Sequence, residues 1–396
     1  MRLMYLTIII VTTVFLCLVF GGCALLARRV YSHAFGRIEE ACENRFHTYI
    51  TWNDIDQNKY PRETVFFKSG KNKLQGFLYG GSNNNGLIII SQGLGNTADH
   101  YLTMIMFFVD RGWSVFAYNN TGVSGSEGSG VIGLTQSLFD LDAALAFVRK
   151  SEALRDLPIM LVGHSWGGFA VCAIFNFDFE HNIKAVVSFA GFNNGNEVID
   201  KLAVSRVGRI YNILSRNVAA IERQLFGEAA KLTAVDGINR ANTPFMIVQS
   251  SNDDVIFADS ISIFAHRDKI TNPNVEIVFL DGDDVSGHEF VFGSREQREY
   301  IKWAAASWRT FRTENRNATR HQWAEKNNFD VFKANQLNME LMEQINIFFY
   351  SWRGFNTPPN RRFDFRAFSK GIKPESNTFR EQHTSSLQGE VVDNAR

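Results

Sequence analysis

The stretch LVGHSWGGFA, residues 161–170, places one serine between glycines at the end of an apolar run. Residues 158–162 are typical of a short buried strand, and the apolar residues after the serine recur at helical spacing. Ser165 is therefore predicted at a strand-to-helix turn. Gly163 and Gly167 bracket it in the pattern G-x-S-x-G, where flanking side chains would collide with so tight a turn. Such a turn lifts a hydroxyl clear of the sheet.

Strand patterns alternate with helix patterns along most of the chain. Further strands are predicted at residues 64–70, 74–80, 86–93, 113–120, 183–191, 243–250 and 275–282, and helices at 101–109, 134–149, 258–267 and 295–313. The first two of these strands are expected to form a hairpin around Gly70. Strands that alternate with helices indicate parallel strands with right-handed crossovers. The predicted fold class is α/β, with a doubly wound, mostly parallel sheet.

A helical, amphipathic stretch at about 193–242 interrupts this alternation. Because ligands gather at the carboxyl ends of parallel strands, we expect this insertion to form a cap over a site, with a peripheral packing helix as the alternative. The predicted domains are a membrane anchor or signal segment at 1–30, a connecting segment at 31–62, the sheet domain at 63–315, and a C-terminal extension at 316–396 that is helical and then disordered.

The amino terminus has the length and polarity of a membrane anchor. Residues 3–27 carry no charged side chain, and a helix of that length would extend about 37 Å, enough to cross a hydrocarbon core of about 30 Å. Arg28 and Arg29 follow it, which favours a cytosolic domain after a single-pass anchor. Two alternatives remain open: a lipoprotein modified at Cys23, and a secreted protein with a cleaved signal peptide.

A serine hydroxyl needs a base and a group that orients the base, and both are expected in loops beyond later strands. Asp253 and Asp254 come directly after the predicted strand at 243–250, and His288 follows the next strand along the chain. The chain order is thus serine, aspartate, histidine. Other serine hydrolase plans place the same three residue types in different orders.

Four stretches together resemble the α/β-hydrolase superfamily, as an outlying member of its esterase, lipase and peptidase-like branch. They are QGLG at 92–95, GHSWGG at 163–168, SSNDDVI at 250–256 and SGHEF at 286–290. The resemblance spans about residues 64–313. It implies a triad of Ser165, Asp253 and His288, in which the histidine accepts the hydroxyl proton and the aspartate orients the histidine. Alignment with the family pattern favours Asp253 over Asp254.

The oxyanion of such a reaction needs hydrogen-bond donors that are already in place. The expected donors are the backbone N–H of Trp166, directly after the serine, and that of Leu94, in the loop after the strand at 86–93. In the family this loop commonly begins with His-Gly. Here Gln92 stands in place of the histidine.

A second departure concerns residues 119–128, NNTGVSGSEG. Many relatives have Asp-x-Arg-Gly-x-Gly-x-Ser-x-Gly in this place. Asn119 and Thr121 therefore replace a charged pair, and we expect the loop to pack behind the site with this polar pair in place of an ion pair. Because the loop departs from the family pattern, the substrate of a particular subfamily cannot be assumed for this protein.

Composition narrows the functional classes. The chain has 41 Lys and Arg and 41 Asp and Glu residues, so its net charge does not favour nucleic acid as a partner. Neither a metal nor an organic cofactor is expected. The predicted function is a membrane-associated serine hydrolase that cleaves an ester or thioester, lipid-derived substrates included, through an acyl-enzyme. The alternatives are a non-catalytic, membrane-tethered binding protein, and an amidase, peptidase or acyltransferase that uses the same triad.

Overall fold

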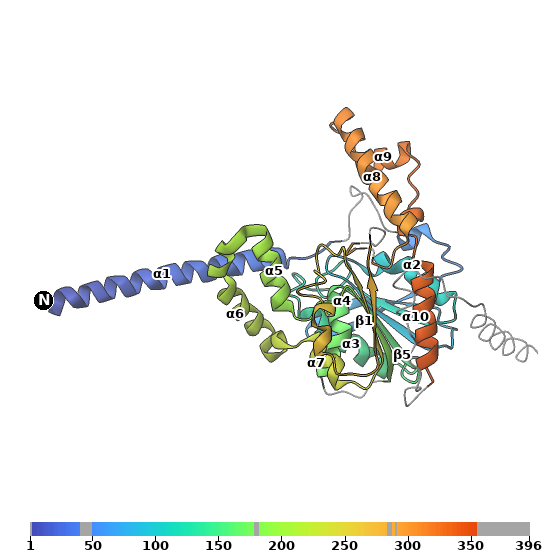
Figure 1. Cartoon of the computed structure of the whole chain (residues 1–396), viewed down its shortest axis with the longest axis horizontal. Coiled ribbons are helices and arrows are strands. Elements are labelled where there is room, and N and C mark those ends of the chain that lie inside the picture. The colour runs from blue at the N-terminus through green and yellow to red at the C-terminus, as the bar shows by residue number, and fades with distance from the viewer. Residues whose placement is uncertain (1, 40–49, 178–181, 283–286, 290, 355–396) are drawn as a thin grey trace, which may run out of the picture. The chain divides into compact units, whose positions relative to one another are not determined.

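A computed structural model describes residues 2–39, 50–177, 182–282, 287–289 and 291–354. Within these residues, eight strands form one sheet in the order β1-β2-β4-β3-β5-β6-β7-β8 (Figure 1). The strands are β1 (Arg62–Ser69), β2 (Asn72–Tyr79), β3 (Leu87–Ser91), β4 (Ser114–Tyr118), β5 (Ile159–His164), β6 (Ile183–Phe189), β7 (Phe245–Ser250) and β8 (Val275–Leu280). Strands β3 to β8 are parallel, and β2 is antiparallel to both β1 and β4.

The hairpin and the buried strands follow from their sequences. Ser69 of β1 pairs with Asn72 of β2, and Gly70 adopts a φ of +56° in the turn between them. Every residue of β3, β4, β5 and β7 is buried, as expected of apolar strands covered on both faces. The hairpin and the mostly parallel sheet are therefore confirmed.

Helices cover both faces of the sheet. On one face, α4 (Trp166–Ala173) contacts β3, β5 and β6, while α3 (Gln136–Lys150) and α7 (Ala234–Arg240) pack against α4. On the other face, α2 (Leu102–Val109) contacts β4 and α10 (Met339–Trp352) contacts β6. Figure 1 shows these two groups on opposite sides of the sheet. The doubly wound arrangement is thus confirmed.

The helix predicted at 258–267 is wrong for most of its length. Turns occupy this stretch, and a 3-10 helix forms only at Phe264–Lys269. Ser262 makes an isolated bridge with Phe192, and its hydroxyl accepts a hydrogen bond from the N–H of Ala265. Serine side chains that bond to the local backbone compete with helix formation.

The inserted stretch is helical, as predicted. It contains α5 (Gly195–Val207), α6 (Ser215–Phe226) and α7, joined by 3-10 turns. The helix α6 packs against α1 (Arg2–Ala34), where the hydroxyl of Tyr31 donates to the buried carboxylate of Glu222. Burial raises the pKa of Glu222 above its usual value.

The last turns of α1 belong to the folded domain. Ala27, Tyr31 and Phe35 are buried and lie on one helical stripe. The predicted boundary between an anchor at 1–30 and a connection at 31–62 therefore falls inside a helix. Among the described residues, no helix has both the length and the apolar character needed to cross a membrane. Most side chains of residues 2–20 lie outside the described part, and the anchor stays a prediction.

The chain beyond the predicted domain end at 315 also packs on the sheet. The helices α8 (Arg295–Glu314) and α9 (Arg320–Lys326) follow β8, and α10 then returns to the sheet. Glu343 of α10 pairs with Arg111, and Asn346 accepts a hydrogen bond from the indole of Trp113 at 2.9 Å. The sheet domain thus continues through α10. The disorder predicted at the chain end falls on residues 355–396, which lie outside the described residues.

Candidate active site

Ser165 lies between β5 and α4 with a strained backbone. Its φ is +54° and its ψ is −109°, a conformation that residues other than glycine rarely adopt. A Cβ on Gly163 would lie 2.2 Å from the carbonyl oxygen of Gly167, and one on Gly167 would lie 1.9 Å from that of Ser91. Both positions therefore require glycine. The structure confirms the tight strand-to-helix turn.

The three predicted loops bring their polar side chains together. The Nε2 atom of His288 lies 2.8 Å from the Oγ atom of Ser165, and its Nδ1 atom lies 3.0 Å from Oδ2 of Asp253. The side chains of His288 and Asp253 are 5% and 0% exposed. The hydroxyl, imidazole and carboxylate thus form one buried hydrogen-bonded series.

The structure also distinguishes the two neighbouring aspartates. Oδ1 of Asp253 accepts hydrogen bonds from the N–H groups of Val255 and Ile256, at 3.0 and 2.7 Å, and Oδ2 accepts one from the amide of Gln249 at 3.2 Å. Asp254 is exposed and does not take part in this series. The carboxylate of Asp253 is therefore the one that faces the imidazole.

The two expected oxyanion donors lie next to Ser165 and beyond β3. Trp166 begins α4, where the first N–H groups of a helix have no partner within the helix. Leu94 lies in the loop after β3, and its N–H donates no hydrogen bond among the described residues. The neighbouring N–H groups of Gly93 and Ser165 are already bonded, to the hydroxyl of Tyr101 and to Phe189, at 2.8 Å each.

A second set of polar residues behind the site was not predicted. The hydroxyl of Tyr101 lies 3.0 Å from Nδ1 of His164, and Nε2 of His164 lies 3.0 Å from the backbone carbonyl oxygen of His288. All three residues are buried. The place of His164 directly before the serine was the one available signal, since a buried histidine beside a nucleophile needs partners for both ring nitrogens.

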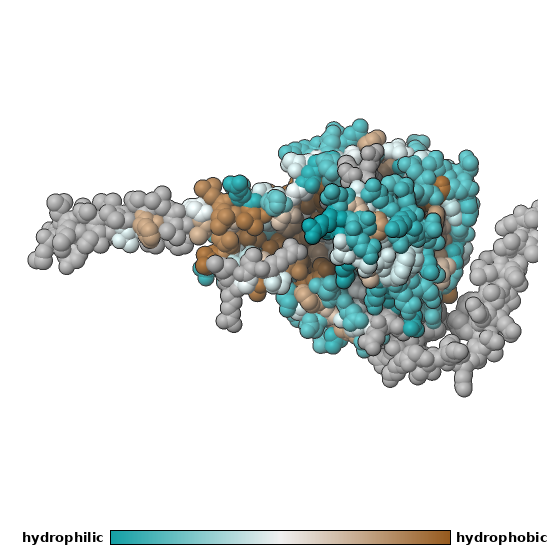
Figure 2. Space-filling view, turned by 90° about the horizontal axis from the view of Figure 1, so that it is seen from above, coloured by the Kyte–Doolittle hydropathy of each residue, from teal (hydrophilic) through white to brown (hydrophobic). Residues whose placement is uncertain are grey.

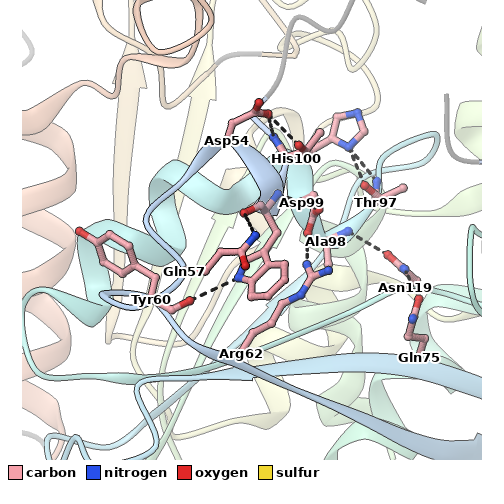
Figure 3. Close-up of polar contacts among 12 residues, drawn as sticks. Asp54, Gln57, Tyr60, Arg62, Gln75, Thr97, Ala98, Asp99, His100 and Asn119 are labelled. Carbon is pink, nitrogen blue, oxygen red and sulfur yellow. Dashed lines mark hydrogen bonds and ion pairs between the residues drawn. The ribbon is translucent and has the colours of Figure 1, made fainter. Parts of the chain in front are cut away.

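Tyr101 ends a 3-10 helix, η2 (Ala98–Tyr101), that is held in place by polar contacts (Figure 3). The guanidinium of Arg62 pairs with Asp99 at 3.0 Å. The amide oxygen of Asn119 accepts a hydrogen bond from the N–H of Ala98 at 2.9 Å, and the amide nitrogen of Asn119 bonds to Gln75 at 3.3 Å. Asn119 thus joins η2 to β2, in a role that involves no ion pair.

Thr121, the other residue that replaces the charged pair, contacts Asp140, which was not predicted from the sequence. Its N–H and hydroxyl bond to the carboxylate of Asp140 in α3, at 2.7 and 2.9 Å. The same carboxylate accepts from Ser69 and Gln136. Burial raises the pKa of Asp140 above its usual value, against the opposing effect of these donors. The loop is therefore held by neutral donors around one buried carboxylate.

Among the residues that the structure describes, no group of three or more His, Cys, Asp or Glu side chains is placed to hold a metal ion. The polar groups around Ser165 are those of the hydrogen-bonded series and of the loops that support it.

Residues 82–220 match the sequence model of a family described as serine aminopeptidase, S33. The match includes β3, the turn at Ser165 and the first part of the helical insertion, with α5. Over these residues the chain is similar to this family, in agreement with the resemblance to α/β-hydrolases. In this chain the central sheet, the strained serine turn and the loops after β7 and β8 occur in the order that the resemblance implied.

Solved structures that resemble this chain include three enzymes of low sequence identity. An esterase from Pyrococcus furiosus is 15% identical with a TM-score of 0.48, over 71% of this chain and 98% of its own. An acylaminoacyl peptidase from Pyrococcus horikoshii is 16% identical with a TM-score of 0.49, over 78% and 43%. Est1E from Butyrivibrio proteoclasticus, with ferulic acid bound, is 17% identical with a TM-score of 0.42, over 57% and 91%. No curated protein sequence matches this chain.

Proposed function

We propose that this protein is a serine hydrolase of the α/β-hydrolase type that cleaves a carboxylic ester or thioester through an acyl-enzyme. The observation that carries the proposal is the hydrogen-bonded series from Ser165 Oγ through both nitrogens of His288 to Asp253, with separations of 2.8 and 3.0 Å. Nucleophile and base within hydrogen-bond reach, with the base oriented by a third group, are what activation of an alcohol requires.

Acylation begins when Ser165 Oγ bonds to the carbonyl carbon of the substrate and its proton passes to Nε2 of His288. The carbonyl π electrons move to oxygen, and the N–H groups of Trp166 and Leu94 donate to that oxyanion. Asp253 accepts from Nδ1–H and stabilises the imidazolium. When the tetrahedral intermediate collapses, the bond to the leaving oxygen or sulfur breaks and His288 returns its proton to that atom.

Deacylation repeats these steps with water as the nucleophile. His288 takes a proton from water as the water oxygen bonds to the acyl carbon. Collapse of the second tetrahedral intermediate breaks the bond to Ser165 Oγ, which receives the proton, and the carboxylic acid leaves. The free serine and the neutral imidazole are restored.

A fluorophosphonate probe tests this proposal, because it reacts with serines that are activated in this way. We expect the full chain to be labelled and Ser165→Ala to remain unlabelled. Ser188→Ala is the matched control, since Ser188 is a buried serine of the adjacent strand and its hydroxyl donates to the carbonyl of Gly168 at 3.0 Å. A folded parent protein that fails to react would instead support the non-catalytic binding protein.

An amide substrate is the second candidate, because the matching family is described as serine aminopeptidase. The same three residues would serve, and the leaving amine would take its proton from His288. Parallel assays with p-nitrophenyl esters of increasing acyl length and with aminoacyl p-nitroanilides separate the two candidates. The ester proposal requires the higher kcat/KM on the esters.

The proposal includes attachment to a membrane through α1. It is supported by the absence of charged residues from 3 to 27 and by apolar side chains that are exposed on α1, at Leu25, Leu26 and Val30. Ile213 and Leu225 of the cap are exposed as well. Figure 2 shows apolar surface gathered where α1 meets the cap. Substrates that lie in the membrane, such as lipid esters, would then be close to the cap.

Sedimentation with phospholipid vesicles tests the attachment. The full chain should sediment with vesicles of phosphatidylcholine and phosphatidylglycerol, whereas a chain that begins at Ala24 should remain in solution. This truncation retains Ala27, Tyr31 and Phe35, which are buried in the fold. Equal sedimentation of the two chains would contradict an anchor in α1, and would point to another lipid-binding surface such as the cap or the C-terminal extension.

A further inference from the structure

A series of hydrogen bonds joins the loop after β3 to the backbone of His288. The N–H of Gly93 donates to the hydroxyl oxygen of Tyr101 at 2.8 Å, and the side-chain amide of Asn96 donates to the same oxygen at 3.2 Å. The Tyr101 hydroxyl contacts Nδ1 of His164 at 3.0 Å. Nε2 of His164 contacts the carbonyl oxygen of His288, also at 3.0 Å.

The partners decide where the protons lie. A tyrosine hydroxyl has one hydrogen, and here its oxygen already accepts two hydrogen bonds, so its own proton is donated to Nδ1 of His164. That nitrogen is then unprotonated, and the ring proton is on Nε2, which donates to the carbonyl of His288. This assignment follows from the network, as tautomers generally do. His164 is thus a neutral imidazole with one defined tautomer.

The surroundings of His164 favour the neutral form. Burial lowers its pKa to about 3, helped by His288 and His100 and opposed by Asp253. The ring of Phe292 packs edge-on against His164 at 5.7 Å between centroids, and it also lies 6.1 Å from the ring of Tyr101. The ring of Phe292 thus provides an apolar contact for both members of the network.

The loop after β3 fits closely around the same groups. A Cβ on Gly93 would lie 3.0 Å from Nδ1 of His164 and 3.3 Å from the Tyr101 hydroxyl. The amide of Gln92, which is buried beside it, makes no hydrogen bond among the described residues. The hydroxyl of Tyr101 therefore holds this loop by hydrogen bonds, whereas the side chain of Gln92, in the usual histidine position, makes none among the described residues.

We propose that Tyr101 and His164 are positioning residues that fix the oxyanion loop and His288 relative to each other. Leu94 follows Gly93 directly, so the bond from Gly93 to Tyr101 places the second oxyanion donor. The bond from His164 to the His288 carbonyl places the base. This inference rests on the proposed function, because it concerns how the same reaction is aligned.

The variant Tyr101→Phe removes the hydroxyl and keeps the ring. The matched control is Tyr118→Phe, since Tyr118 is also fully buried and its hydroxyl bonds to Ser91 at 3.2 Å rather than to His164. We expect kcat for a soluble ester to fall about 10- to 100-fold in Tyr101→Phe, with KM little changed, because small misplacements of reacting groups have effects of this size. Tyr118→Phe should keep kcat within about threefold.

Nitrogen-15 NMR of histidine-labelled wild-type protein reads the network directly. The signals of His164, assigned by their loss in His164→Asn, should show an unprotonated Nδ1 and a protonated Nε2 from pH 5 to 9. In Tyr101→Phe the Nδ1 signal should shift, because its donor is gone. A His164 that titrates in this range, or that carries its proton on Nδ1, would overturn the proposal.

The kinetic outcomes are equally decisive. If Tyr101→Phe and Tyr118→Phe lose kcat equally, the effect is a general one of buried tyrosines and the positioning role is wrong. If wild type neither hydrolyses esters nor reacts with fluorophosphonate, the proposed function fails, whereas the NMR measurement still decides whether the network has the stated tautomer.

Discussion

The loop after β7 and the start of α3 each hold a buried aspartate, and their surroundings differ in one respect. Asp253 accepts hydrogen bonds from two backbone N–H groups and an amide, and its remaining contact is the imidazole of His288. Asp140 accepts from hydroxyl, amide and backbone donors only. A carboxylate beside a base can orient the base and stabilise its protonated form, whereas one among neutral donors can only hold elements together.

The largest expected effect is on catalysis at Asp253. In Asp253→Asn the amide cannot stabilise the imidazolium or hold the reactive tautomer, so kcat for a soluble ester should fall about 10⁴-fold. Steady-state kinetics on the full chain provide the measurement. A fall of less than about tenfold would mean that the carboxylate at this position is structural, like that of Asp140.

The next effect is on stability at Asp140. Asp140→Ala leaves the donors of Ser69, Thr121 and Gln136 buried without an acceptor, and we expect the free energy of unfolding to fall by about 3 kcal/mol. Urea denaturation gives this value. The kcat of the folded variant should fall far less than that of Asp253→Asn, and an equal loss would erase the distinction between the two carboxylates.

Glu276 in β8 extends the comparison to a half-buried carboxylate with few hydrogen-bond donors around it. One of its oxygens is buried with no hydrogen-bond partner among the described residues, and burial raises its pKa to about 7. The folded state therefore binds its proton more tightly than the unfolded chain does. The stability that Glu276 contributes is fully present below about pH 4.5, the usual pKa of a glutamate. It is lost as the pH rises through about 7, the pKa of Glu276 in the folded state.

The test of this pH dependence compares wild type with Glu276→Gln between pH 4.5 and 8. The unfolding free energy of wild type should decrease relative to that of the variant across this range. Other carboxylates with raised pKa values are present in both proteins and cancel in the difference. A difference that does not change with pH would show that Glu276 is solvated like a surface carboxylate.

The smallest expected effect is at Asp254. Its side chain is exposed and lies outside the triad series, so Asp254→Asn should change kcat by less than about twofold. The same kinetic assay serves, with Asp253→Asn measured beside it. If Asp254→Asn were the more damaging change, the roles assigned to these neighbours would be reversed.

The sequence predicted the strands and the three loops because each has a local signal. The apolar runs from Leu87 and from Ile159, and the glycines on either side of Ser165, are readable without knowledge of distant contacts. The choice between Asp253 and Asp254 depended on the family pattern. Only the structure shows which of the two side chains faces the imidazole of His288.

The supporting groups could not be predicted because their partners are distant in the chain. Tyr101 meets His164 across 63 positions, and Asp140 meets Ser69 across 71. In the sequence Asp140 is a polar residue of an amphipathic helix, for which an exposed position is the ordinary expectation. For the same reason the sequence left open whether the helix at α10 packs against the domain or a partner, since a helical pattern does not state which surface the helix covers.

The most direct test of the central claim is to trap the acyl group within the first turnover. The full chain is mixed with a p-nitrophenyl ester, quenched in acid and digested, and the peptides are examined by mass spectrometry. We predict one acyl group on the peptide that contains Ser165, and its absence in Ser165→Ala. Hydrolysis that continues in Ser165→Ala, or an acyl group carried by a different residue, would contradict the account.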